Sequence, residues 1–140
     1  MKVKVSKGNV GSIEADALVV NLFEGVKKPA GATGSVDKLL GGVISQLIRE
    51  GEVTGKKNEV TLIHTLNKMP ASRVMIIGLG QKSKFSPDIL RQVLGTAMRR
   101  LRSLKVKRVA SIAHGAGIGG MDPAVSAQAI TEGVILGLYK

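Results

Sequence analysis

Segments of strand length alternate along this chain with segments of helical periodicity, and this alternation restricts the possible folds more than any other feature. The clearest strand is Ala17–Phe23, ALVVNLF, because a nearly continuous apolar run of this length is typical of a strand buried on both faces. Four further strands are expected at Lys2–Ser6, Glu59–Leu66, Arg73–Leu79 and Lys107–Ala113. The order predicts an α/β domain of three layers, with a mixed and mostly parallel sheet and helices on both faces.

Three segments repeat apolar residues at spacings of three and four, as one face of a helix does. The first spans residues 36–48, with Ser35 as the candidate N-cap and Gly51 as the candidate stop. The last begins at Asp122-Pro123, a cap followed by proline, and runs toward Leu138.

The middle helix has the strongest start signal, Ser86-Pro87-Asp88. Serine can cap, proline fits the first helical position, and aspartate favours the positive end of the helix dipole. The apolar face expected to join the core consists of Leu90, Val93, Leu94, Ala97, Met98, Leu101 and Leu104.

The composition limits the class of protein. A chain of 140 residues, with 44% hydrophobic and 22% charged residues, has the size and composition of one globular domain. The absence of cysteine excludes disulfides, thiolate metal sites and cysteine nucleophiles. No apolar run approaches the roughly 20 residues that span a bilayer, so we expect a cytoplasmic protein without a membrane partner.

The net charge of +11 would attract nucleic acid, anionic lipid or an acidic partner. Aromatic residues make up only 2%, which leaves phosphate contacts but almost excludes stacking on single-stranded bases. No acidic residue lies between Asp88 and Asp122, where basic residues are frequent. Helical geometry places Arg91, Arg99 and Arg102 on one flank outside the apolar face, where they are candidate contacts to nucleic acid. The default interpretation is a solvated helix surface.

Two glycine-rich segments follow expected strands and precede expected helices, which is where open α/β sheets bind ligands. Gly78-Leu79-Gly80 is a weak signal, because Ser83 occupies the position of a third glycine. Asp122 would repel an anion at the second segment, HGAGIGG, so a structural turn is the favoured interpretation there. Four glycines of that segment could still bring backbone N–H groups to a phosphate: Gly115, Gly117, Gly119 and Gly120.

The acidic residues are scattered singly, whereas a two-metal hydrolytic site needs several carboxylates that converge on the ions. His64 is expected in a strand, and only His114, beside the glycine loop, is a candidate functional histidine. No catalytic or metal-binding residue is therefore assigned.

Four segments together resemble the N-terminal domain of leucyl aminopeptidases of the cytosol aminopeptidase family: DALVVNLFEG, GATGSVDKLLGG, RVMIIGLGQKSKFSPDILRQVLGTAMRRLRSLKVKRVA and EGVILGLYK. The resemblance implies a single N-terminal domain over residues 1–140, without the catalytic domain. It also implies a metallo-exopeptidase family that removes N-terminal amino acids with two divalent metals, manganese or zinc. Its members assemble as homo-hexamers, and this domain's first partner would be its own catalytic domain.

The same domain is similar to macro domains, which bind ADP-ribose. The shared residues include Gly8-Asn9-Val10 and the stretch from Asp16 to Asn21, so Asn9 and Asn21 join the glycines as candidate ligand-binding residues. Asn9 stands where an adenine-binding macro domain usually has aspartate, and Glu24 stands where it has a second asparagine. Both differences argue against strong ADP-ribose binding.

Three functions are consistent with these features: a structural and assembly domain of an aminopeptidase, a macro-like nucleotide-binding module, and a non-specific nucleic-acid-binding module. The extent of the sequence match favours the first.

Overall fold

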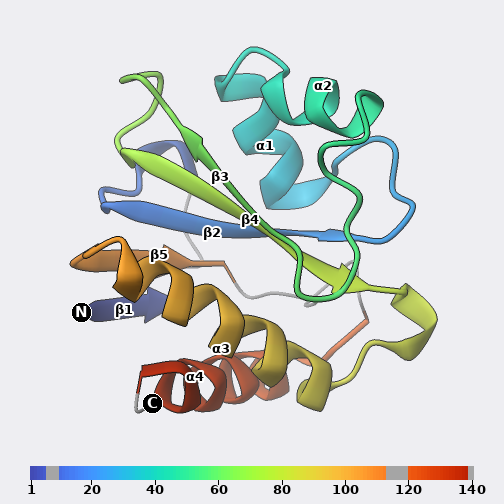
Figure 1. Cartoon of the computed structure of the whole chain (residues 1–140), viewed down its shortest axis with the longest axis vertical. Coiled ribbons are helices and arrows are strands. Elements are labelled where there is room, and N and C mark those ends of the chain that lie inside the picture. The colour runs from blue at the N-terminus through green and yellow to red at the C-terminus, as the bar shows by residue number, and fades with distance from the viewer. Residues whose placement is uncertain (6–9, 113–119, 139–140) are drawn as a thin grey trace.

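A computed structural model of the chain describes residues 1–5, 10–112 and 120–138. Within these residues five strands form one sheet in the order β1-β5-β2-β4-β3 (Figure 1). Neighbouring strands are parallel, except that β3 runs antiparallel to β4 at one edge. The predicted mixed, mostly parallel sheet is confirmed. The strands are β1 Lys2–Val5, β2 Ala17–Phe23, β3 Val60–His64, β4 Arg73–Gly80 and β5 Arg108–Ser111.

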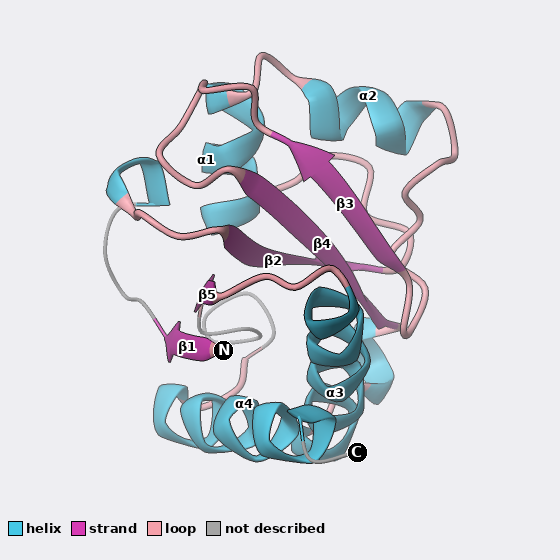
Figure 2. Ribbon diagram, turned by 60° about the vertical axis from the view of Figure 1, so that its left-hand side comes forward, coloured by secondary structure: helices cyan, strands magenta, loops and turns pink. Residues whose placement is uncertain are grey.

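Helices cover both faces of the sheet, as predicted (Figure 2). Successive residues of the buried strand β2 serve the two layers, with Val19 in the core under α3 and α4 and Val20 in the core under α1 and α2. The helices are α1 Gly31–Leu39, α2 Val43–Arg49, α3 Pro87–Ser103 and α4 Pro123–Leu138.

The single helix predicted over residues 36–48 is wrong, because the segment folds as α1 and α2. Gly41 and Gly42 separate them with left-handed φ values of 74° and 87°, which a continuous helix cannot contain. The Gly42 N–H donates to the Asp37 carbonyl oxygen at 2.8 Å and closes α1. Ser35, expected to be the N-cap, lies inside α1.

The carboxylate of Asp37 holds the start of α2 against α1. It accepts hydrogen bonds from the Ser45 backbone N–H at 3.0 Å and from the Ser45 hydroxyl. Ser45 lies in the first turn of α2, so this carboxylate caps a helix in which it does not lie. The predicted stop at Gly51 is confirmed by its left-handed φ of 77°, just after α2 ends.

The two other predicted helix starts are confirmed. Ser86 Oγ accepts from the Ile89 N–H at 3.2 Å, and Asp122 Oδ1 accepts from the Ala124 N–H at 2.8 Å. The predicted apolar face of α3 is buried except for Leu104, which follows the last residue of the helix and is exposed.

Two strands are shorter than predicted. β3 does not fill Glu59–Leu66, because Leu66 and Asn67 turn the chain with positive φ values of 52° and 66°. β5 covers the central residues of the predicted Lys107–Ala113. Ser6 and Ala113, the last residues of two predicted strands, lie outside the described part of the chain.

Helices α3 and α4 pack closely through glycine. A Cβ atom on Gly133 would lie 2.8 Å from the Arg91 carbonyl oxygen, and one on Gly137 would lie 2.8 Å from the Gly95 carbonyl oxygen. Both distances are too short for a side chain, so this seam requires glycine on α4.

Candidate functional site

The predicted ligand site at the glycine loop is described only in part. Asn21 lies near the carboxyl end of β2, where its carbonyl oxygen accepts from Thr33 Oγ1 at 2.8 Å. Gly120 has a left-handed φ of 73°, as a turn requires. The remaining predicted residues lie outside the described residues, and their role stays a prediction: Asn9, His114, Gly115, Gly117 and Gly119.

The first turn of α4 already has an anionic partner. Asp122 Oδ1 accepts from the backbone N–H groups of Ala124, at 2.8 Å, and Val125, at 3.4 Å. A phosphate at this helix end would have to compete with that carboxylate.

The glycines of Gly78-Leu79-Gly80 serve the packing of the chain. A Cβ on Gly78 would lie 1.9 Å from the carbonyl oxygen of Lys56, so glycine lets the 54–59 turn cross the end of β4. The N–H groups of Gly78 and Gly80 donate to the carbonyl oxygens of Glu59, at 2.8 Å, and Gly55, at 2.9 Å. These amides are therefore unavailable to a phosphate.

The 54–59 turn is organised around the carboxylate of Glu59. It accepts from the Thr54 N–H at 2.9 Å, the Gly55 N–H at 3.0 Å and the Thr54 hydroxyl at 2.6 Å. Burial raises the pKa of this carboxyl, but the hydrogen bonds and the nearby Lys56 outweigh burial, so the pKa of Glu59 lies below its ordinary value. Three hydrogen bonds within one turn mark this carboxylate as structural.

The structure gives the three arginines predicted to bind nucleic acid different surroundings. Arg91 Nε donates to Glu132 Oε1 at 2.9 Å, and Arg91 also pairs with Asp88. The hydrogen bond that Arg91 donates to Glu132 is the main reason that the pKa of Arg91 is raised. Arg102 Nη1 donates to the Leu138 carbonyl oxygen at 2.6 Å.

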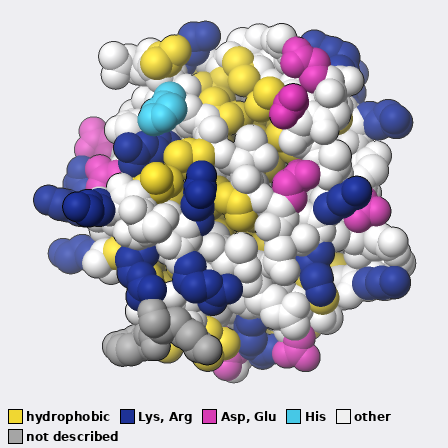
Figure 3. Space-filling view, in the orientation of Figure 1, with side chains coloured by type: hydrophobic (Ala, Val, Ile, Leu, Met, Phe, Trp, Pro, Cys, Tyr) yellow, Lys and Arg dark blue, Asp and Glu magenta, His cyan; other side chains and the backbone are white. Residues whose placement is uncertain are grey.

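The pair with Glu132 leaves no local signal, because Glu132 is 41 residues away, whereas Asp88 lies three residues before Arg91 and was a signal for the other pair. Arg91 and Arg99 line one cleft of about 520 Å³ between α3 and α4, whereas Arg102 is not among its lining residues. The three arginines therefore do not line one common site. Lys and Arg side chains are also dispersed among carboxylates over the face shown in Figure 3.

A groove of about 840 Å³ lies beside the amino-terminal halves of β1 and β5. We call it the β1–β5 groove. The groove was not predicted from the sequence. The available signal was the alternation of Lys2 and Lys4 with Val3 and Val5, which places both lysines on one face of the strand. Its lining residues are Lys2, Val3, Lys4, Ser12, Ile13, Glu14, Ala15, Arg108, Val109 and Ala110.

Three large apolar side chains of α4 are exposed, and one of them, Leu136, lines the cleft beside α3. Ile135 is 50% exposed and Leu136 is 59% exposed, and Val125, near the start of the helix, is 41% exposed. Large exposed apolar side chains grouped on one helix are typical of an interaction surface.

The described residues contain no group of three or more His, Cys, Asp or Glu side chains that could hold a metal ion. No helix within that part of the chain is long and apolar enough to cross a membrane.

The fold places the chain in the macrodomain-like class, as predicted. The macrodomain of Mycobacterium tuberculosis DarG superposes with a TM-score of 0.75 at 18% identity, over 94% of this chain and 88% of that chain. A mutant of tomato leucine aminopeptidase superposes with a TM-score of 0.76 at 21% identity, over 100% of this chain and 28% of that chain. At these identities the likeness shows the fold, which alone does not specify a ligand.

Sequence comparison narrows this class to a family. The family model described as "Cytosol aminopeptidase family, N-terminal domain" matches residues 19–140. A probable cytosol aminopeptidase of Geobacter sulfurreducens is 35% identical over 140 residues, which are 100% of this chain and 28% of that relative. The chain belongs to the cytosol aminopeptidase family, and it spans about a quarter of the length of the curated relatives that it matches.

Proposed function

We propose that this chain acts as the non-catalytic N-terminal domain of a cytoplasmic aminopeptidase and packs against the metallopeptidase domain of the longer protein. That protein would remove N-terminal amino acids from peptides with two divalent metals, manganese or zinc, and would assemble as a homo-hexamer. The family match supports the proposal, together with the relatives' much greater length.

The described residues do not fit the two metals, because no group of carboxylates and histidines converges among them. We therefore assign no catalytic step to them. The metals and the chemistry would belong to the part of the longer protein that corresponds to the other three quarters of the relatives' sequences.

The exposed apolar side chains near the end of α4 are the observation that carries the proposed packing role. The matched region is an N-terminal domain, so in the relatives the rest of the polypeptide follows the equivalent of α4. Ile135 and Leu136 lie near the end of this helix with half or more of their surface exposed. Burying both side chains would contribute on the order of 1–3 kcal/mol, which favours a docked neighbouring domain.

A chimaera tests this role. This chain would replace the matched quarter of the Geobacter sulfurreducens relative, and melting temperatures would be compared with those of the isolated chain. We expect Ile135→Ser/Leu136→Ser to lower the melting temperature of the chimaera by at least about 2 °C and to leave that of the isolated chain nearly unchanged.

The matched control is Leu66→Ser, since Leu66 is 79% exposed in the loop between β3 and β4. It should alter neither protein. An equal effect of the α4 variant on both proteins would show that α4 does not dock. Turnover of a leucyl amide by the isolated chain with manganese or zinc would show that the domain is catalytic and would contradict the proposal.

A further inference from the structure

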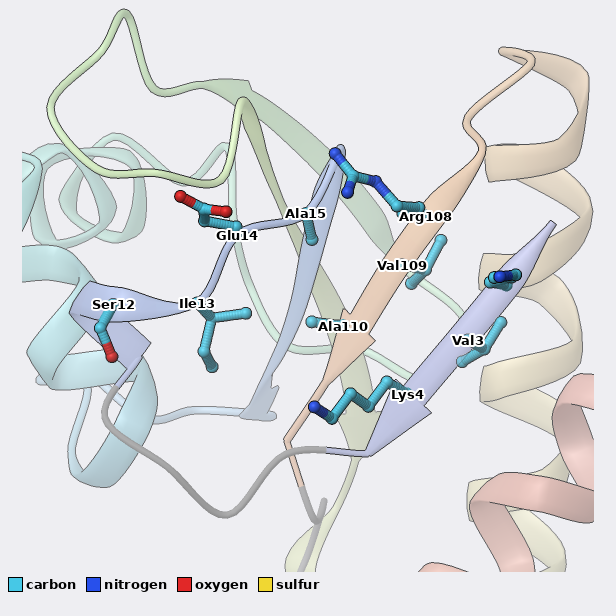
Figure 4. Close-up of a pocket in the computed structure, with 10 residues that line it drawn as sticks. Val3, Lys4, Ser12, Ile13, Glu14, Ala15, Arg108, Val109 and Ala110 are labelled. Atoms are coloured by element: carbon cyan, nitrogen blue, oxygen red, sulfur yellow. The ribbon is translucent and has the colours of Figure 1, made fainter.

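One part of the sheet lacks a covering layer. On the face that carries α1 and α2, the helices pack over β2 and β4, where Leu18, Val20 and Val74 belong to their core. Among the described residues, no α-helix lies over β1 and the first half of β5 on this face, and the segment 12–15 lies beside them (Figure 4). The β1–β5 groove is the space between these strands and that segment.

The groove has a cationic side. Lys2 and Lys4 are exposed and lie on this face of β1, because Val3 and Val5 pack against the opposite core. Arg108 on β5 is in register with Lys2. In Figure 4, Lys4 extends across the groove toward Ile13.

Acidic residues offset little of this charge. Glu14 lines the groove, but it is one carboxylate against three cations. Asp16, which lies nearby in sequence, accepts from the backbone N–H groups of Lys107, at 3.2 Å, and Arg108, at 2.8 Å, so its carboxylate serves the start of β5.

Two residues give the groove an apolar part: Ala110 forms part of its floor and Ile13 part of its wall, and Ser12 also lines it. The side chains of Val3 and Val109 pack in the opposite core. Among the described residues the lining contains no aromatic side chain on which a nucleobase could stack. Its volume is within the range of sites that bind small molecules.

We propose that the β1–β5 groove binds a carboxylate carried on an apolar chain. The apolar chain would lie on Ala110 and Ile13, and the carboxylate would pair with Lys4, while Arg108 at the other end of the groove adds to the positive potential. A medium-chain acid and the C-terminus of an apolar peptide both present this chemistry. The site is independent of the proposed docking residues on α4.

Ligand titrations followed by amide NMR test the proposal without altering the protein. Octanoate should shift the signals of Lys4, Ile13 and Ala110 saturably, whereas octanamide, which lacks the charge, should bind at least about fivefold more weakly. Affinity should rise from butanoate to octanoate by roughly twofold or more for each buried methylene. N-acetyl-alanyl-leucine and its amide form a second pair, which distinguishes a peptide terminus from an acyl chain.

Substitutions assign the site. Lys4→Gln should weaken octanoate binding roughly two- to fivefold, and Lys4→Gln/Arg108→Gln about tenfold, while the exposed control Lys82→Gln on the far side of the sheet should have no effect. The proposal is overturned if octanoate and octanamide bind equally, if affinity ignores chain length, or if no shift occurs at millimolar ligand. Shifts centred on Ile135 and Leu136 would assign the binding to α4 and would overturn it too.

Discussion

The carboxylate of Glu59 shows how one side chain can fix a turn that crosses the end of a sheet. Its hydrogen bonds to Thr54 and Gly55 favour the ionised form, so its pKa is lower in the folded state than the ordinary 4.5. A carboxyl group whose pKa is lower in the folded state stabilises the protein at pH values above its unfolded-state pKa. This stabilisation is lost as the pH falls through the folded-state pKa. The turn is therefore expected to weaken in acid, below about pH 4.5.

Glu59→Gln should lower the free energy of unfolding at pH 7 by about 1 kcal/mol, because the amide cannot accept all three hydrogen bonds and the site is partly screened by solvent. The difference from the unsubstituted protein should shrink as the pH falls from about 4.5 to about 3. Urea denaturation at these pH values measures it. Glu52→Gln, at an exposed position in the same loop, is the control and should show neither effect. A difference that is independent of pH would contradict the role given to the charge.

Residues that act on their near neighbours in sequence could be predicted. Ser86 and Asp122 cap the helices that they precede, and each needs a partner only two or three positions away. The pair between Arg91 and Glu132 could not be predicted, because it depends on how α3 packs on α4 and leaves no local signal.

At the scale of elements, the contact between α3 and α4 depends on the absence of side chains. Gly133 and Gly137 meet the backbone of α3 at distances that leave no room for a Cβ, while the space around Gly95 on α3 is ordinary. Helical periodicity predicted both helices, but it could not show which glycines face the partner helix. Helical periodicity also predicted α1 and α2 as one helix. The apolar spacing continues across Gly41 and Gly42, but the backbone leaves the helical conformation there.

Two glycine substitutions in this seam should have opposite signs. Gly133→Ala should lower the free energy of unfolding by about 1–3 kcal/mol, because the new methyl group would lie 2.8 Å from the Arg91 carbonyl oxygen. Gly95→Ala should raise it by about 0.5–1 kcal/mol, since alanine favours the helix and its methyl group would lie 3.5 Å or more from its neighbours. Chemical denaturation measures both. Stabilisation by Gly133→Ala would show that the seam is looser than the structure indicates.

For the molecule as a whole, the formal net charge is +11, and some of the basic side chains are paired with carboxylates. Arg91 is bound by Glu132 and Asp88. Arg99 is exposed and has no acidic partner among the ion pairs of the described residues. This arrangement favours weak electrostatic attraction to polyanions over a shaped nucleic-acid site.

Duplex DNA should therefore bind weakly, without sequence preference and only at low salt. Arg99→Ala should reduce the slope of log affinity against log salt by up to about 0.9, the value for one neutralised phosphate. Arg91→Ala should leave the slope nearly unchanged, because its guanidinium is held by carboxylates. Fluorescence anisotropy over a salt series measures these slopes. Salt-insensitive or sequence-selective binding would contradict this prediction.

The strand order also determines when the sheet can be completed during synthesis. β1 pairs only with β5, with Lys2 opposite Arg108, whereas β2 finds its partner β4 about half as far along the chain. A ribosome adding roughly 5–20 residues per second needs on the order of 5–20 s to pass from one strand of the β1–β5 pair to the other. Throughout that interval β1 is a nascent strand without its partner, and its two lysines disfavour pairing with a neighbouring chain. Of the five strands of this sheet, β1 is thus synthesised first and is among the last that can join it.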